Sequence, residues 1–285
     1  MLRISDIPCL HMNSPIDGFG RKGSDLVAGN YTVGSATSVF SVSELRLCFW
    51  PIVATIALGF LVILPTALAN SLAVRIMGME RVSAMPWIAL YANHLVQLLV
   101  ALLLIGWLSK GRFSEYGLQW PKGKSYVVAA IAWGAFFGVL MTIVDYFPQI
   151  LARHALGDLP LTALNLAGWL SFEGFFVGFS EEIPFRGLLQ TFLMKRSSGR
   201  IRFLKFDMHV AGVILALLFA LAHVSNFWER PFWFALGQQG YAFALAILYA
   251  YWYEKSGSLL ASIVGHNVGD VVEYALMFLM AWLWR

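Results

Sequence analysis

Long apolar runs constrain the fold of this chain more than any other feature of its sequence. A run of about 20 mostly apolar residues can cross a bilayer as a helix. Seven such runs follow one another, at about Phe49–Val74, Trp87–Leu108, Tyr126–Tyr146, Leu161–Leu193, Met208–Val224, Phe234–Trp252 and Ser258–Trp284. The sequence therefore predicts an all-α protein, a polytopic membrane bundle of about 7–8 transmembrane helices.

The composition excludes the main soluble classes. Hydrophobic residues make up 59% of the 285 positions and charged residues 13%, whereas soluble proteins carry about 25% charged residues. Two cysteines are too few for a disulfide scaffold. The net charge of +4 fits topology signals and contacts with membrane lipid. No basic segment outside the runs carries interleaved aromatic residues, so we expect no nucleic-acid partner.

The chain divides into two segments of different polarity. Residues 1–46 are polar and have no apolar period, so we expect a loosely ordered tail there. Residues 47–285 form the membrane domain. Of the 20 basic residues, 14 lie in segments that would share one side of the membrane with the N-terminus, and 5 lie opposite. Cytoplasmic segments are enriched in Lys and Arg, so we expect a cytoplasmic N-terminus.

Several ionisable residues lie within the apolar runs. Each charge there costs roughly 2.5–3.5 kcal/mol on insertion scales, so each needs a physical reason. The candidates are His94, Glu173, Glu181, Glu182, Arg186, His223, His266, Asp270 and Glu273. We interpret His94 as a hydrogen-bonding contact between helices, and Glu173 and Glu273 as hydrogen-bonded or protonated interior groups.

Three of these residues share a depth in the bilayer. Glu181, His223 and His266 lie 14, 16 and 11 residues from the nearest charged residue on the cytoplasmic side. At about 1.5 Å per residue, these separations are roughly 21, 24 and 16 Å. Leucine or phenylalanine would pack better at such positions. The shared depth therefore indicates a functional site made of one carboxylate and two imidazoles.

The spacing of nearby residues predicts different surroundings for two neighbouring carboxylates. Glu182 and Arg186 are four residues apart and face each other on a helix, so we expect an ion pair. Glu181 points about 100° away and has no such partner, which suits a general base. Pro184 cannot donate to the carbonyl of Ser180, so we expect a bend there.

These residues form three ordered motifs. Glu181-Glu182-Ile-Pro-Phe-Arg186 fits E-E-x-x-x-R, Phe219-Ala-Leu-Ala-His223 fits F-x-x-x-H, and His266-Asn-Val-Gly-Asp270 fits H-x-x-x-[ND]. Their order and spacing resemble the CPBP family (CAAX proteases and bacteriocin-processing enzymes, also called Abi), whose best-known members are type II CAAX prenyl endopeptidases. The resemblance covers about residues 85–275 and implies an intramembrane peptidase.

The resemblance also implies a role for each matched residue. Glu181 would activate water with help from His223, and His266 with the residue at position 270 would stabilise the oxyanion. Glu182 and Arg186 would hold the arrangement, supported by the motif positions Phe219 and Asn267. The prenyl endopeptidases have asparagine where this chain has Asp270. An ionised aspartate cannot donate to an oxyanion, so Asp270 either is protonated and donates or is ionised and orients His266.

The same residues leave open whether a metal takes part. Glu181, His223 and His266 could hold zinc, because imidazole and carboxylate are usual zinc ligands. Peptide hydrolysis otherwise needs only an activated water and a donor for the developing negative charge. No H-E-x-x-H motif is present. We therefore favour a metal-free glutamic mechanism with no cofactor.

The expected function is that of an intramembrane endopeptidase whose site opens toward the cytoplasmic half of the bilayer. Its partners would be membrane lipid and a peptide or membrane-anchored protein substrate. A proton-coupled transporter and a catalytically silent membrane scaffold remain as alternatives, although the repeats typical of transporters are not found. Because many members of the family are bacterial, the bacterial inner membrane is the expected location.

Overall fold

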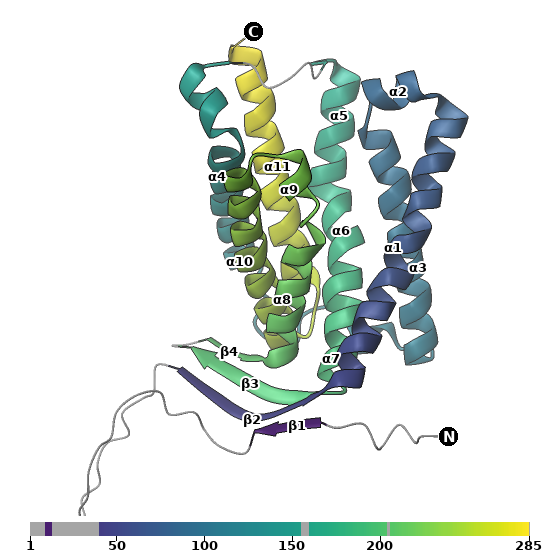
Figure 1. Cartoon of the computed structure of the whole chain (residues 1–285), viewed down its shortest axis with the longest axis vertical. Helices are drawn as coiled ribbons and strands as arrows, with labels where there is room; N and C mark the ends of the chain where they lie inside the picture. Colours follow the sequence, from purple (N-terminus) through teal and green to yellow (C-terminus); the bar gives the residue numbers. More distant parts are fainter. Residues whose placement is uncertain (1–8, 13–39, 155–159, 204–205, 285) are drawn as a thin grey trace, which may run out of the picture.

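The computed structural model is a bundle of long helices that stands on a small β-sheet (Figure 1). It describes residues 9–12, 40–154, 160–203 and 206–284. Six long helices cross the bundle: α1 (Phe49–Met77), α3 (Trp87–Ser109), α4 (Val127–Ala152), α8 (Val210–Ala222), α10 (Phe232–Ser256) and α11 (Leu260–Leu283). Three short helices lie in the connections: α2 (Met79–Ala84), η2 (Phe113–Tyr116) and α9 (Asn226–Glu229).

A seventh crossing element is a continuous helical rod, residues 163–194, with two π-helical turns. Its parts are α5 (Ala163–Ser171), η3 (Phe172–Phe176), α6 (Val177–Glu182), η4 (Ile183–Gln190) and α7 (Thr191–Met194), of which η3 and η4 are π-helical. The rod begins where the Thr162 side chain accepts a hydrogen bond from the Asn165 N–H. A bend was predicted at Pro184; this proline lies in η4, so the helix there is π-helical.

Each of the seven apolar runs coincides with a long helix or with the rod. Four stretches are long and apolar enough to span a membrane by length and composition: Phe49–Met77, Trp87–Ser109, Val127–Ala152 and Val210–Glu229. The protein is therefore a mostly helical integral membrane protein. The rod carries three glutamates, and α11 carries His266, Asp270 and Glu273, which lower the hydropathy of these elements.

The sheet below the bundle has four antiparallel strands, in the order β1 (Cys9–Met12), β2 (Phe40–Cys48), β3 (Ser198–Phe203) and β4 (Phe206–His209). Parts of the expected loose tail are thus strands, while residues 1–8 and 13–39 lie outside the described residues. Residues 40–47 alternate between apolar and polar, apart from a break near position 44. The pairing register shifts between Ser43 and Arg46, at that break. A period of two predicts a strand, and the overall polarity of the segment obscured it.

Polar contacts attach the β3–β4 hairpin to the end of α10. Arg200 donates to Asp207 Oδ1 at 2.8 Å and to Glu254 Oε1 at 2.7 Å. The second oxygen of Glu254 accepts from the His209 N–H at 2.7 Å. The hydrogen bond from Arg200 holds the pKa of the Asp207 carboxyl below its usual range. The hairpin that joins the rod to α8 is thereby fixed against the helical bundle.

Glycines bring α4 and α11 into direct backbone contact. A Cβ atom at Gly134 would lie 2.5 Å from the Gly265 carbonyl oxygen, and one at Gly138 would lie 2.5 Å from the Gly269 carbonyl oxygen. On both helices the two glycines are four residues apart and share a face. Small residues at this spacing allow membrane helices to approach closely, and here they fix the position of the helix that carries His266.

We predict that Gly134→Val separates α4 from α11 and lowers the thermal unfolding midpoint in detergent. Overpacking typically costs about 1–3 kcal/mol, and a backbone carbonyl cannot rotate away as a side chain can. Gly240→Val on α10 is the matched control, because no atom lies within 4 Å of a Cβ there. Equal midpoints for the two variants would contradict the close packing.

Candidate active site

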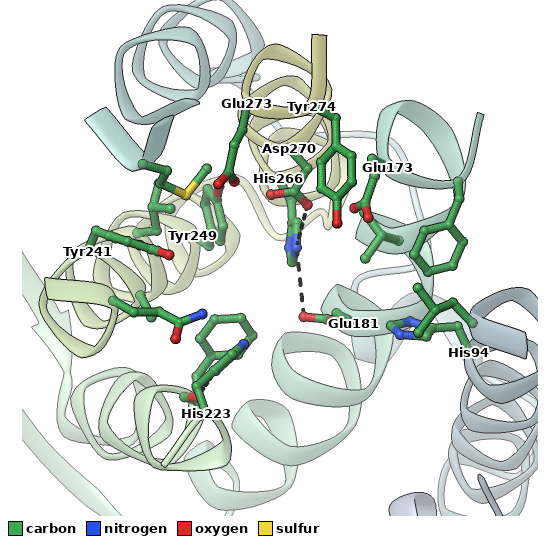
Figure 2. Close-up of a pocket in the computed structure, with 18 residues that line it drawn as sticks. His94, Glu173, Glu181, His223, Tyr241, Tyr249, His266, Asp270, Glu273 and Tyr274 are labelled. Atoms are coloured by element: carbon green, nitrogen blue, oxygen red, sulfur yellow. Dashed lines mark hydrogen bonds and ion pairs between the residues drawn. The ribbon is translucent and has the colours of Figure 1, made fainter. Parts of the chain in front are cut away.

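A cavity of about 280 Å³ lies inside the bundle, between α3, the rod, α8, α10 and α11 (Figure 2). The four residues predicted to be catalytic, Glu181, His223, His266 and Asp270, all line it. His94, Glu173 and Glu273 line it as well. The structure thus brings together seven of the nine candidate residues, and the other two, Glu182 and Arg186, lie directly behind.

His266 lies at the centre of the polar contacts. Its Nδ1 atom is 2.8 Å from Glu182 Oε1, while its Nε2 atom is 3.2 Å from Asp270 Oδ2 and 3.7 Å from Glu181 Oε2. Ionised carboxylates only accept hydrogen bonds, so this surrounding favours an imidazole that carries a proton on both nitrogens. Such a ring presents an Nε2–H donor to the cavity, where an oxyanion could accept it.

Aromatic rings fix the plane of His266. The Tyr249 ring stacks on the imidazole at a centroid distance of 5.7 Å and an interplanar angle of 18°. The Phe219 ring meets it edge-on at 6.3 Å. With 8% of its surface exposed, the imidazole has little freedom to rotate. Phe219 of the F-x-x-x-H motif therefore has a packing role, which the sequence pattern alone did not reveal.

Glu182 and Arg186 form the predicted ion pair. Arg186 Nη1 donates to Glu182 Oε1 at 3.0 Å, and the two side chains are 0% and 1% exposed. The guanidinium also lies 4.6 Å from the centre of the Phe219 ring and 5.4 Å from that of Tyr249. Because Glu182 Oε1 accepts from both Arg186 and His266, this carboxylate links η4 to α11. The contact with His266 is a role that the spacing did not predict.

Glu181 lies directly before Glu182 on the same helix. Unlike Glu182, it has no hydrogen-bond partner among the described residues. Its side chain is 20% exposed and faces the cavity. The neighbouring carboxylate is already occupied by two donors. Glu181 is therefore free to bind a water molecule or a substrate group.

His223 ends α8 on the opposite side of the cavity (Figure 2). Its Nδ1 atom lies 2.9 Å from the Phe219 carbonyl oxygen, which can only accept, so Nδ1 carries the proton. The Nε2 lone pair is then free. Within the described part of the chain, no hydrogen bond or ion pair joins His223 to Glu181, and the expected cooperation between them would need a bridging molecule.

Asn267 anchors the rod to α11 next to the first π-helical turn. Its side chain accepts from the Gly178 N–H at 2.7 Å and donates to the Phe175 carbonyl at 2.9 Å. A Cβ atom at Gly178 would lie 2.5 Å from Asn267 Oδ1, so only glycine leaves room for this bond. The supporting position Asn267 thus fixes the register between the helix of Glu181 and the helix of His266.

Several lining residues were not predicted from the sequence. Gln238, Tyr241 and Tyr249 of α10 face the cavity, at a spacing that places them on one helix face. Tyr241 also donates to Asp145 Oδ2 at 3.0 Å, and Asp145 pairs with Arg230 at 3.0 Å. A polar glutamine within an apolar run was the available signal. Asp145 lay one residue from the end of its run and was overlooked.

The lining shows which way the cavity extends. Relative to His266 and Glu181, most other lining residues lie on the side away from the sheet, as the direction of each helix in Figure 1 shows. Gln238 on α10 is 18 residues before the sheet-side end of that helix, and Glu273 on α11 is 13 residues after its sheet-side start. The cavity therefore extends from His266 and Glu181 in the direction away from the sheet.

The proposed zinc ligands do not form a ligand cluster. Among the described residues, no three His, Cys, Asp or Glu side chains come close enough together to hold a metal ion. Glu181, His223 and His266 share the cavity, but His223 faces it from the far wall (Figure 2). His266 has carboxylates at both nitrogens, which leaves no free lone pair for a metal in this arrangement.

Comparison with known proteins agrees with the three motifs. Residues 163–272 match the model of a family described as Type II CAAX prenyl endopeptidase Rce1-like. No curated protein and no solved structure gives a significant match. The matched segment runs from the start of the rod into α11 and contains Glu181, His223 and His266. This segment is thus similar to the family that the motifs predicted, whereas α1, α3 and α4 lie outside the match.

We predict that Glu182→Gln destabilises the protein by about 3–5 kcal/mol, because it leaves Arg186 buried without a counter-charge. The thermal unfolding midpoint in detergent measures this loss. Glu115→Gln is the matched control, because Glu115 pairs with Lys195 at 2.9 Å on the surface, where ion pairs contribute little. A midpoint for Glu182→Gln equal to that of the control would contradict the structural role of Glu182.

Proposed function

We propose that this protein is an intramembrane endopeptidase that hydrolyses a peptide bond with water activated by Glu181. The observation that carries the proposal is that two adjacent carboxylates have different surroundings. Glu182 accepts from Arg186 and His266 behind the cavity, while Glu181 faces the cavity without a hydrogen-bond partner among the described residues. A free carboxylate beside a fixed imidazole donor provides the base and the oxyanion donor that amide hydrolysis requires.

The chemistry proceeds through a tetrahedral intermediate. Glu181 removes a proton from water as the water oxygen bonds to the scissile carbonyl carbon. His266 Nε2–H donates to the oxyanion, and the Nε2 lone pair of His223 can orient the water from the opposite wall. When the C–N bond breaks, its electron pair goes to nitrogen, and the leaving amine must gain a proton.

Asp270 has two possible roles beside His266, and both are metal-free. A protonated Asp270 would donate to the oxyanion together with His266. An ionised Asp270 would hold His266 as an imidazolium, so that His266 donates alone. The separation of 3.2 Å between Asp270 Oδ2 and His266 Nε2 is compatible with either role. We propose the donor role, and we propose no metal because the side chains do not form a ligand cluster.

We further propose seven transmembrane segments with the N-terminus and the sheet in the cytoplasm of a bacterium, in the inner membrane. The excess of basic residues on the sheet side supports this orientation, and the seven crossing elements support the count. The cavity extends away from the sheet, so its lining gives no support to an opening toward the cytoplasmic half, which the sequence analysis expected.

The substrate that we propose is a peptide segment of a protein held at the membrane. The description of the matched family names a CAAX prenyl endopeptidase. For this chain the cavity volume of about 280 Å³ accommodates a short extended segment, not a folded domain. The peptide would therefore have to be unfolded locally before it is cleaved.

We predict that Glu181→Gln abolishes cleavage of a quenched fluorescent peptide by the purified protein, with a loss of at least about 100-fold, and leaves the unfolding midpoint unchanged. Glutamine keeps the shape of the side chain and removes the base. Glu115→Gln again serves as the control, with normal cleavage. A transporter or a silent scaffold would show no cleavage in the wild type, and full activity of Glu181→Gln would exclude Glu181 as the base.

For Asp270→Asn we expect substantial residual activity, because asparagine can donate to an oxyanion as the proposed protonated aspartate does. Zinc analysis of the purified wild type and of the variant accompanies the assay. If the wild type contains stoichiometric zinc, and the variant loses the zinc together with its activity, the metal-free mechanism is wrong.

A further inference from the structure

His94 on α3 is an imidazole of the cavity to which the proposed chemistry gives no role. It lies outside the segment that matches the protease family, and the sequence analysis interpreted it as a contact between helices. The structure confirms such a contact, since His94 Nδ1 lies 2.8 Å from Ser180 Oγ on the rod. The same ring also lines the cavity with Glu181 (Figure 2).

The hydrogen bonds of Ser180 determine which nitrogen of His94 carries the proton. Ser180 Oγ lies 2.8 Å from the Val177 carbonyl oxygen. Only the hydroxyl can supply a hydrogen between two such oxygens, so its proton points toward Val177. Ser180 Oγ must then accept from His94, whose Nδ1 is protonated. The Nε2 atom of His94 is left with a free lone pair.

Two further contacts hold this imidazole in place. The Phe172 ring meets it edge-on, with centroids 5.0 Å apart and an interplanar angle of 89°. One turn along α3, Gln97 Nε2 donates to the Ser180 carbonyl at 2.7 Å. This carbonyl receives no hydrogen bond from residue 184, because proline has no N–H. Helix α3 is thus bonded twice to the residue that directly precedes Glu181.

His94 and Glu181 line the same cavity, on the side that faces His223 (Figure 2). The other two imidazoles of the cavity already have roles: His266 has carboxylates at both nitrogens, and His223 stands on the opposite wall with the attacking water. The leaving amine still needs a proton donor. His94 is the remaining imidazole that faces the reaction centre.

We propose that His94 is a further catalytic residue, which carries the proton from Glu181 to the leaving amine. This proposal rests on the proposed peptidase function. The proton that Glu181 takes from water passes to His94 Nε2, and the transient imidazolium, still bonded to Ser180 through Nδ1, donates it to the amine nitrogen as the C–N bond breaks. Glu181 and His94 both return to their initial states, and the products are a carboxylic acid and an amine.

The test compares peptide and ester cleavage in His94→Asn. The asparagine side chain can still donate to Ser180, but it cannot carry a proton. The probes are a quenched fluorescent peptide that the wild type cleaves and Glu181→Gln does not, and its analogue with an ester at the scissile bond. An alkoxide leaves without prior protonation far more readily than an amide anion. We expect kcat for the peptide to fall about 100-fold or more, and kcat for the ester to fall less than about 10-fold.

Tyr91→Phe is the matched control. Tyr91 lies one turn before His94 and donates to Ser171 Oγ at 3.0 Å, so this variant also removes a hydrogen bond between α3 and the rod, but outside the cavity lining. We expect normal cleavage of both probes. Equal losses for peptide and ester in a folded His94→Asn, or no loss for either, would overturn the role of His94.

A second measurement does not depend on the variant folding. ¹⁵N chemical shifts of histidine-labelled wild type, in detergent or bilayers, report the tautomer of each imidazole. We expect His94 to be protonated at Nδ1, and protonation at Nε2 alone would overturn the proposal. If the wild type cleaves no peptide at all, the peptidase function fails, and this role fails with it. Cleavage that depends on Glu181 but not on His94 overturns only the present inference.

Discussion

One oxygen atom of Glu182 accepts hydrogen bonds from Arg186 and from His266, and the geometry of the site depends on this shared contact. Both donors are buried, and in a low-dielectric interior a charge without a partner is costly. The contact therefore keeps η4 and α11 in one register. It also frees the preceding residue, since Glu181 points to the cavity while Glu182 points to the packing behind it. Adjacent carboxylates thus have different functions because a helix turns by about 100° per residue.

The sequence predicted what depends on local spacing. Apolar runs of bilayer length gave the crossing helices, and the separation of four residues between Glu182 and Arg186 gave their ion pair. Contacts between distant segments could not be predicted in the same way. The bond between Glu182 and His266 depends on how the rod and α11 pack, and so do the bonds of the Asn267 amide to the rod at the first π-helical turn. The pairing of strand β2 with β3 could not be predicted either, because β3 lies more than 150 residues further along the chain.

The polar groups inside this bundle illustrate how a membrane protein accommodates irregular helices. A π-helical turn or a proline leaves backbone groups that lipid cannot satisfy. Here the amides of Asn267 and Gln97, on helices to either side of the rod, bond to the rod next to η3 and next to Pro184. The bond from Gln97 connects the matched segment to α3, which lies outside the match. The cavity is therefore formed by the whole bundle, because α3 and α4 also contribute lining residues that the matched segment lacks.

The glycine contact between α4 and α11 has a consequence for motion. Two helices whose backbones touch at successive turns cannot slide past each other by a side-chain rotation, because no side chain separates them. They must move as one rigid unit, and His266 and Asp270 travel with it. Any widening of the cavity that admits a peptide then has to come from the other walls, which include α8 with His223 and the helix α10 that packs against it. The helix pair that carries His266 and Asp270 is therefore a fixed frame of the cavity, against which the remaining walls would have to move.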